Sequence, residues 1–185
     1  CTRCSGPSAI RKPGRSVRVS LLAISGLLFR QTLERVAIDH FTKEFIGPRP
    51  AFRNTAFDVE STFVEMRDGT KLSTRIYTPK GDGPWPTLLV RDAYQFQKYL
   101  TCHYYVRYGY ACVHQDVRGQ GESEGEWCPL KHETDDGADI LDWLTQQAFQ
   151  NGKIALVGGS YLGLAQWAVA DRLPAEVKTM VPTTS

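Results

Sequence analysis

Short apolar runs of strand length recur along the chain, and between them apolar residues return at the spacing of a helix. The expected strands, in chain order, are residues 59–66, 72–77, 87–90, 110–117, 154–157 and 177–181. The expected helices are residues 95–108, 131–149 and 161–172. Asp68-Gly69, between the first two strands, is typical of a hairpin turn. Short strands that alternate with helices predict an α/β fold with a doubly wound, mainly parallel sheet behind an antiparallel hairpin.

The cluster Gly47-Pro48-Arg49-Pro50 divides the chain into two parts. We interpret residues 1–50 as an N-terminal extension of uncertain structure and residues 51–185 as the N-terminal part of an α/β domain. The chain begins with a cysteine rather than a methionine and stops just after an apolar run, so we expect a fragment that is cut at both ends.

Residues 17–29 are apolar and follow four basic residues, which resembles the start of a signal peptide. A membrane span needs about 20 apolar residues, so this segment is short for a crossing. No small-residue cleavage site follows it, and an amphipathic helix or a stretch outside the mature domain fits as well. The location of the protein therefore stays open, with the cytoplasm favoured and export or membrane association as alternatives.

Composition and cysteine spacing argue against two kinds of binding. The formal net charge is only +2 and no long basic stripe occurs, so we expect no nucleic-acid binding. Cys1 and Cys4 form a C-x-x-C pair, but the further ligands of a zinc site are missing, so we expect no metal site. Cys112 lies inside an apolar strand pattern, where we expect a buried, reduced thiol.

The junction between the strand at residues 154–157 and the helix that follows carries the main candidate for chemistry. Gly158-Gly159-Ser160 makes a sharp strand-to-helix turn that lifts one hydroxyl at the corner, which predicts a nucleophilic serine. A phosphate-binding turn is the first alternative, but Ser160 takes the place of a glycine that a dinucleotide fingerprint needs, and no Walker lysine follows. We therefore expect no cofactor. The second alternative is a serine that caps the helix beginning at Tyr161.

Three further segments accompany this junction. The loop at residues 118–128 is rich in glycine and glutamate, and we expect Asp116 and Arg118 to hold it while its carboxylates face solvent. Tyr94 follows the strand at residues 87–90, where its hydroxyl could serve a developing oxyanion or its ring could simply pack over the sheet edge. Glu133, Asp135 and Asp136 begin the helix at residues 131–149, where the helix dipole favours anions.

The chain resembles the CocE/NonD hydrolases, the family of cocaine esterase and X-Pro dipeptidyl-peptidase-like enzymes. The matching stretches are residues 64–79, 108–127 and 158–163 together with Gln166. The resemblance implies an α/β-hydrolase fold, truncated after the strand that follows the nucleophile helix. It also implies that Ser160 is the nucleophile, and that the Tyr94 hydroxyl and the backbone N–H of Tyr161 form the oxyanion hole. Ala93 and Phe149 depart from the family pattern, which usually has proline and tryptophan there.

In that family the triad aspartate and histidine follow the nucleophile, and only 25 residues without a histidine follow Ser160 here. None of the four histidines follows the nucleophile, as the family order requires. His40 lies outside the matching region, and His103 and His132 belong to expected helices. His114 lies within an expected strand, where we expect a core residue or one that supports the site. We therefore expect the fragment by itself to be inactive.

The resemblance implies a serine hydrolase that cleaves carboxylic esters or amides, including X-Pro peptides, through an acyl-enzyme. We favour an ester over a peptide substrate, because an ester demands less of the binding pocket. The expected partner is therefore a small ester, amide or short peptide, and the oligomeric state stays open. The rival hypothesis is a non-catalytic α/β module that binds a ligand or partner in the same crevice.

Overall fold

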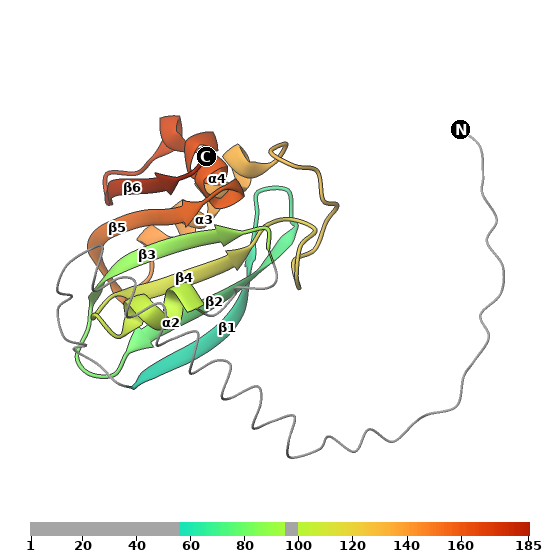
Figure 1. Cartoon of the computed structure of the whole chain (residues 1–185). Helices are drawn as coiled ribbons and strands as arrows, with labels where there is room; N and C mark the ends of the chain where they lie inside the picture. The colour runs from blue at the N-terminus through green and yellow to red at the C-terminus, as the bar shows by residue number, and fades with distance from the viewer. Residues whose placement is uncertain (1–55, 95–99) are drawn as a thin grey trace, which may run out of the picture. The chain divides into compact units, whose positions relative to one another are not determined.

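The computed structural model of the chain describes residues 56–94 and 100–185, whose backbone forms a six-stranded sheet with the order β1-β2-β4-β3-β5-β6 (Figure 1). The strands are β1 (Phe57–Glu65), β2 (Lys71–Pro79), β3 (Trp85–Asp92), β4 (Ala111–Asp116), β5 (Gln150–Gly159) and β6 (Val177–Thr183). The helices are α2 (Leu100–Val106), α3 (Glu133–Thr145) and α4 (Tyr161–Ala168), and the 3₁₀ turn η1 (Ala170–Arg172) follows. The expected extension, residues 1–50, lies outside the described residues.

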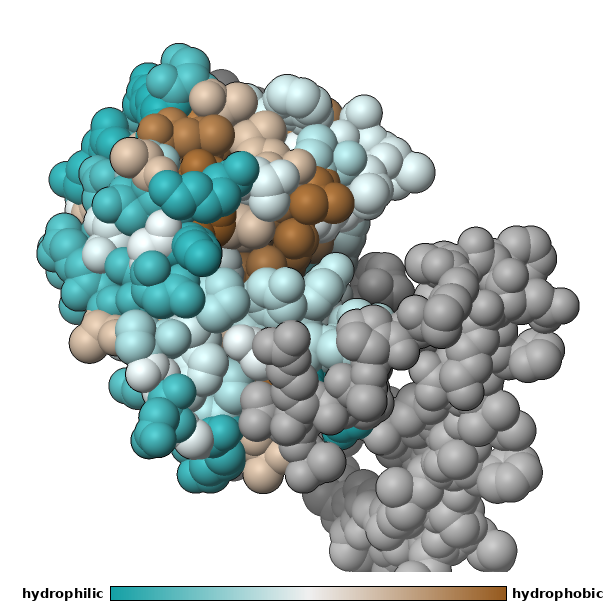
Figure 2. All heavy atoms as spheres, turned by 90° about the vertical axis from the view of Figure 1, so that its left-hand side faces the viewer, coloured by the Kyte–Doolittle hydropathy of each residue, from teal (hydrophilic) through white to brown (hydrophobic). Residues whose placement is uncertain are grey.

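The sheet has the direction pattern that the sequence predicts. β4, β3, β5 and β6 run parallel to one another, whereas β1 and β2 form an antiparallel hairpin whose second strand pairs with β4. Asp68 and Gly69 make the hairpin turn: Gly69 takes a φ of 84°, and Asp68 Oδ1 accepts the Thr70 N–H at 3.1 Å. The edge at which the parallel strands begin faces the viewer in Figure 2, where hydrophilic side chains surround an apolar patch.

The central strands are buried on both faces because helices cover both. Along β3, Leu88 and Val90 belong to the hydrophobic cluster under α2, whereas Leu89, between them, belongs to the cluster under α3. This alternation follows from the two-residue period of a strand. Figure 1 shows the result: α2 lies on one face of the sheet and α3 on the other. A sheet covered in this way explains the continuously apolar strands of the sequence.

The described helices end before their patterns predict. The one expected over residues 131–149 ends at Thr145, and the chain then enters β5 at Gln150. Phe149 continues the apolar pattern but packs against the core from the connection. The helix expected over residues 161–172 divides into α4 and η1, and α2 occupies part of the range expected at residues 95–108. None of these helices, in the part of the chain that is described, has the length and apolar character that a membrane crossing requires.

The expectation of a reduced thiol at Cys112 is wrong. Cys112 on β4 forms a disulfide with Cys102 on α2, and the two Cα atoms are 5.3 Å apart. Both residues are fully buried in the cluster between α2 and the sheet. The pairing depends on which face of α2 lies over β4, and that is a property of the packed fold rather than of cysteine spacing.

Candidate active site

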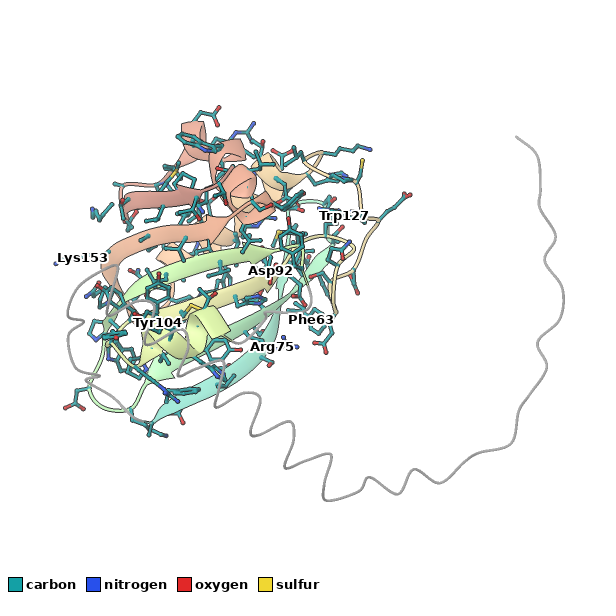
Figure 3. All side chains as sticks on the ribbon, viewed as in Figure 1. Phe63, Arg75, Asp92, Tyr104, Trp127 and Lys153 are labelled. Carbon is teal, nitrogen blue, oxygen red and sulfur yellow. A yellow bond between two sulfur atoms is a disulfide. The ribbon has the colours of Figure 1, made fainter. Side chains whose placement is uncertain are left out.

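The parallel strands β3, β4 and β5 end at one edge of the sheet, and a cavity of about 290 Å³ lies there. Its lining includes Val90, Asp92, Tyr94, His114, Ser160 and Leu162. Figure 3 shows Asp92 at this edge, Trp127 beyond it, and Lys153 at the opposite edge. Ligands of open α/β sheets bind outside the carboxyl ends of the strands, so this cavity is the candidate site.

Ser160 occupies the turn between β5 and α4 with a φ of 56° and a ψ of −125°, outside the backbone regions that residues with side chains favour. Its hydroxyl makes no capping hydrogen bond to α4, so the helix-cap alternative does not describe this side chain. The backbone holds the turn instead, because the Ser160 N–H donates to the Thr183 carbonyl at 2.9 Å. A Cβ on Gly158, whose φ is 149°, would overlap the Leu162 side chain, so the turn requires glycine there.

The three residues that the sequence singles out lie together. Ser160 Oγ is 3.0 Å from the Tyr94 hydroxyl oxygen, and the Tyr161 N–H donates to the same oxygen at 3.4 Å. Tyr94 is 37% exposed, so a ligand in the cavity can reach its hydroxyl. A serine hydroxyl, a phenol O–H and a backbone N–H that converge on one point are the groups that acyl transfer uses.

Behind these groups lies a pair of buried side chains, Asp92 and His114, and the sequence singled out only the histidine. Their side chains are 5% and 3% exposed, and His114 Nε2 is 3.1 Å from Asp92 Oδ2. A carboxylate only accepts hydrogen bonds, so Nε2 carries the hydrogen of this contact. Asp92 Oδ1 accepts the Tyr94 N–H at 2.6 Å. The only sequence signal for Asp92 is its place at the end of a strand, two residues before Tyr94.

The side chain of Tyr161 points away from the cavity chemistry into a buried ionic contact. Its O–H donates to Glu133 Oε1 at 2.8 Å and accepts the Leu130 N–H at 3.0 Å. Glu133 Oε2 lies 2.5 Å from Arg91 Nη1, and the two side chains are 3% and 4% exposed. Burial, together with the hydrogen bond to Glu133, raises the pKa of the Tyr161 hydroxyl well above its ordinary value. The hydroxyl therefore stays a donor, and α4 is fixed to the start of α3.

Arg118 holds the glycine-rich loop after β4, as the sequence predicts. Its guanidinium donates to Asp136 Oδ1 and to Asp68 Oδ2, each at 2.7 Å. The hydrogen bonds that Arg118 donates to Asp136 and then to Asp68 raise the pKa of Arg118, against the opposing effect of burial. Asp116 also ties the loop, because its carboxylate accepts the Glu122 N–H at 3.3 Å.

Two of the acidic residues at the start of α3 form buried ion pairs, in addition to their favourable interaction with the helix dipole. Glu133 and Asp136 are 3% and 1% exposed, and their partners are Arg91 and Arg118. Burial of a charge is tolerated when an opposite charge and hydrogen bonds compensate it. We call Arg91, Arg118, Glu133 and Asp136 the ion cluster. Within the described residues, no group of three or more His, Cys, Asp or Glu side chains is placed to hold a metal ion.

Comparison with known proteins identifies the family to which this chain belongs. Residues 68–185 match the model of the X-Pro dipeptidyl-peptidase (S15 family). The chain is 38% identical over 133 residues to cocaine esterase from Rhodococcus sp., an alignment that covers 66% of this chain and 23% of that protein. The chain therefore spans about a quarter of the length of this relative.

Solved structures agree with the family match. A CocE/NonD family hydrolase from Staphylococcus aureus superposes with a TM-score of 0.59 and 29% identity, over 67% of this chain and 27% of that one. An α-amino acid ester hydrolase superposes with a TM-score of 0.62 and 27% identity, over 74% and 27% of the two chains. These likenesses confirm the predicted α/β-hydrolase fold. The chain belongs to the X-Pro dipeptidyl-peptidase (S15) family of hydrolases, among the CocE/NonD hydrolases.

Proposed function

We propose that Ser160 is the nucleophile of a serine hydrolase that cleaves carboxylic ester bonds through an acyl-enzyme. The observation that carries this proposal is the convergence of Ser160 Oγ, the Tyr94 hydroxyl and the Tyr161 N–H at distances of 3.0 and 3.4 Å. The family match and the esterase names of its relatives support it.

The proposed reaction gives each of these groups a separate role. Ser160 Oγ attacks the ester carbonyl, and the carbonyl oxygen takes up the negative charge. The Tyr94 O–H and the Tyr161 N–H then donate to that oxygen instead of contacting each other, each stabilising the transition state by about 3 kcal/mol. The alcohol leaves, and water later attacks the acyl-enzyme to release the acid.

A serine hydroxyl also needs a base to accept its proton. His114 lines the cavity, but its Nε2 hydrogen is directed at Asp92. His103 packs against the Tyr77 ring at a centroid distance of 5.4 Å, and His132 precedes the first turn of α3. We propose that the base and the carboxylate that orients it come from outside the described residues, and that residues 1–185 alone turn over no ester.

We propose an ester rather than an X-Pro peptide as the substrate. Among its relatives, one is named a cocaine esterase and another an α-amino acid ester hydrolase, whereas the family model is named for a dipeptidyl-peptidase. An alcohol leaves a tetrahedral intermediate more readily than an amine, which must first receive a proton from the catalytic base. The ester reaction therefore asks less of groups beyond Ser160, Tyr94 and Tyr161.

The test uses the natural full-length protein that contains this chain. Wild type is treated with a fluorophosphonate, the modified peptide is identified by mass spectrometry, and hydrolysis of p-nitrophenyl esters is measured. We expect the label on Ser160, and we expect Ser160→Ala to lose both the label and, on the order of 10⁴-fold or more, the turnover. Ser61→Ala, which removes an exposed hydroxyl on β1, is the matched control and should retain both.

The same experiment separates the alternatives. A protein whose Ser160 stays unlabelled while the Ser160→Ala variant keeps its ligand would be a binding module, and the proposal would be wrong. Residues 1–185 expressed alone should leave p-nitrophenyl esters intact. Ser160-dependent hydrolysis by that piece would show that the base lies within this chain.

A further inference from the structure

The position of the Tyr94 hydroxyl depends on the backbone bend that follows β3. The residue is 37% exposed, so packing alone constrains its ring less than it would constrain a buried one. The bend itself is held by Asp92. Its Oδ1 accepts the Tyr94 N–H at 2.6 Å, and its carbonyl accepts the Val117 N–H at 3.0 Å. Asp92 therefore connects the end of β3 both to Tyr94 and to the residue that follows β4.

Asp92 is itself held from the neighbouring strand. His114 lies on β4, which pairs with β3 in parallel, and His114 Nε2 meets Asp92 Oδ2 at 3.1 Å. The second ring nitrogen, Nδ1, lies 4.0 Å from Asp116 Oδ1, so the imidazole sits between two buried carboxylates. A carboxylate cut off from water needs hydrogen bonds on both oxygens. Tyr94 N–H satisfies one oxygen of Asp92, and His114 satisfies the other.

We propose that Asp92 and His114 are positioning residues, which hold the bend so that the Tyr94 hydroxyl faces Ser160 Oγ and the Tyr161 N–H. This inference rests on the proposed function, because it assigns Tyr94 to the oxyanion hole. The order of contacts is His114 Nε2 to Asp92, Asp92 to the Tyr94 N–H, and the Tyr94 hydroxyl to Ser160 Oγ, at 3.1, 2.6 and 3.0 Å. Neither Asp92 nor His114 touches the reacting atoms in this arrangement.

The variants differ in how many of the contacts from His114 through Asp92 to Tyr94 they keep. Asp92→Ala removes the acceptor of the Tyr94 N–H and should lower kcat about 30-fold, whereas His114→Phe leaves that acceptor and should lower kcat about 10-fold. Asp92→Asn keeps an amide oxygen for the Tyr94 N–H, and its amide N–H can meet the other tautomer of His114. It should stay within about threefold of wild type. KM should change less than twofold in each variant, because the oxyanion forms only after binding.

A cycle with Tyr94→Phe separates positioning from structural damage. In the natural full-length protein, kcat for a p-nitrophenyl ester is measured for wild type, His114→Phe, Tyr94→Phe and the double variant. If His114 acts through the Tyr94 hydroxyl, His114→Phe should lower kcat about 10-fold in wild type but less than twofold in Tyr94→Phe. Thr87→Val is the matched control, since it removes a buried hydroxyl that bonds the Trp85 carbonyl on the same strand, away from the bend. It should leave kcat within twofold.

The outcomes are distinct. Equal losses from His114→Phe in both backgrounds, or a loss in Asp92→Asn as large as in Asp92→Ala, would overturn the positioning role while Ser160 labelling and the Tyr94→Phe effect still support the hydrolase. Activity that persists in Ser160→Ala would instead overturn the proposed function. A circular dichroism spectrum and an unfolding midpoint for each variant show whether it is folded, so that a loss of kcat is not caused by misfolding.

Discussion

Polar groups gather in two places near the carboxyl edge of the sheet, and their surroundings differ. One place is the reactive corner, made of Ser160 Oγ, the Tyr94 hydroxyl and the Tyr161 N–H, where contacts are 3.0 and 3.4 Å long and Tyr94 is 37% exposed. The other place is the ion cluster, whose residues are 1% to 9% exposed and whose closest contacts are 2.5 and 2.7 Å. The corner faces a cavity, whereas the cluster lies between α3 and the sheet.

This difference indicates which polar groups can react. Groups in the corner are hydroxyl and N–H groups that contact one another, so a substrate oxygen can replace those contacts without leaving a buried charge behind. Groups in the cluster form buried ion pairs, and removal of one partner would leave the opposite charge buried without its pair. We infer that the cluster stabilises the elements that carry the corner, and that the corner is where chemistry occurs. Variants in the two places should therefore affect different measurements.

Among the variants that separate the cluster from the corner, the largest expected effect is on folding, from Arg118→Met. This change leaves Asp136, which is 1% exposed, without its cationic partner, and should lower the free energy of unfolding by about 3 kcal/mol. The measurement is urea unfolding of the natural full-length protein, followed by circular dichroism. Fluorophosphonate labelling of Ser160 in the absence of urea should persist.

A double variant tests whether charge is the cause. Arg118→Met with Asp136→Leu removes both charges, and replacing a buried ion pair by apolar side chains is often neutral or better. We expect it to recover more than half of the lost stability. Equal stability of the single variant and wild type would contradict the assignment of Arg118 to a stabilising cluster.

The second effect is on the rate, from Tyr94→Phe. The substitution keeps the ring and the bend but removes the hydroxyl that is 3.0 Å from Ser160 Oγ. Loss of one oxyanion donor should lower kcat about 100-fold, or about 2.7 kcal/mol, with KM almost unchanged. The free energy of unfolding should change by less than about 0.5 kcal/mol, because an exposed hydroxyl contributes little to stability. A large loss of stability with no loss of kcat would show that the Tyr94 hydroxyl stabilises the fold and does not act in the reaction, which would contradict the difference inferred between the corner and the cluster.

A smaller effect is expected from Tyr161→Phe, because Tyr161 belongs to the corner through its N–H and contacts the cluster through its O–H. The variant keeps the N–H and loses the hydroxyl bonds to Glu133 and to the Leu130 N–H. We expect the free energy of unfolding to fall by about 1–2 kcal/mol, while kcat falls less than about fivefold. Steady-state kinetics and urea unfolding on the same preparation test this. A fall in kcat as large as that of Tyr94→Phe would show that the hydroxyl itself takes part in the reaction.

The sequence predicts the fold well because local patterns decide most of it. The hairpin at Asp68-Gly69 and the buried strands around residues 87–90 and 154–157 are confirmed. Helix ends are less accurate, since the apolar pattern continues through Phe149 although the helix ends at Thr145. The disulfide between Cys102 and Cys112 depends on how α2 lies on the sheet, which no local pattern contains.

The site is predicted in part. The turn at Ser160 has a local signature, since glycines and a strand-to-helix change surround it, and the structure places Tyr94 and Tyr161 beside it. Asp92 has no such signature, because one acidic residue at a strand end is common in solvent-facing loops. Glu133 and Asp136 look like ordinary acids in the first turn of a helix, and only the packed fold shows that they are buried. The catalytic roles of Ser160, Tyr94 and Tyr161 stay predictions.

The smallest effect concerns Asp68, the exposed partner of Arg118 in the hairpin turn. Hydrogen bonds from Arg118, and then from Thr70, hold the pKa of the Asp68 carboxyl well below its usual range. A group whose pKa is lower in the folded state contributes stability above its unfolded pKa, about 3.9, and loses that contribution as the pH falls toward the folded value. Asp68→Asn should therefore be less stable than wild type at pH 7, and the difference should shrink below about pH 4. Urea midpoints from pH 7 to pH 2 measure it. The same substitution in the Arg118→Met background should have a smaller pH dependence, because only the hydrogen bonds from Thr70 remain. A difference between Asp68→Asn and wild type that stays constant down to pH 2 would contradict the role of Arg118.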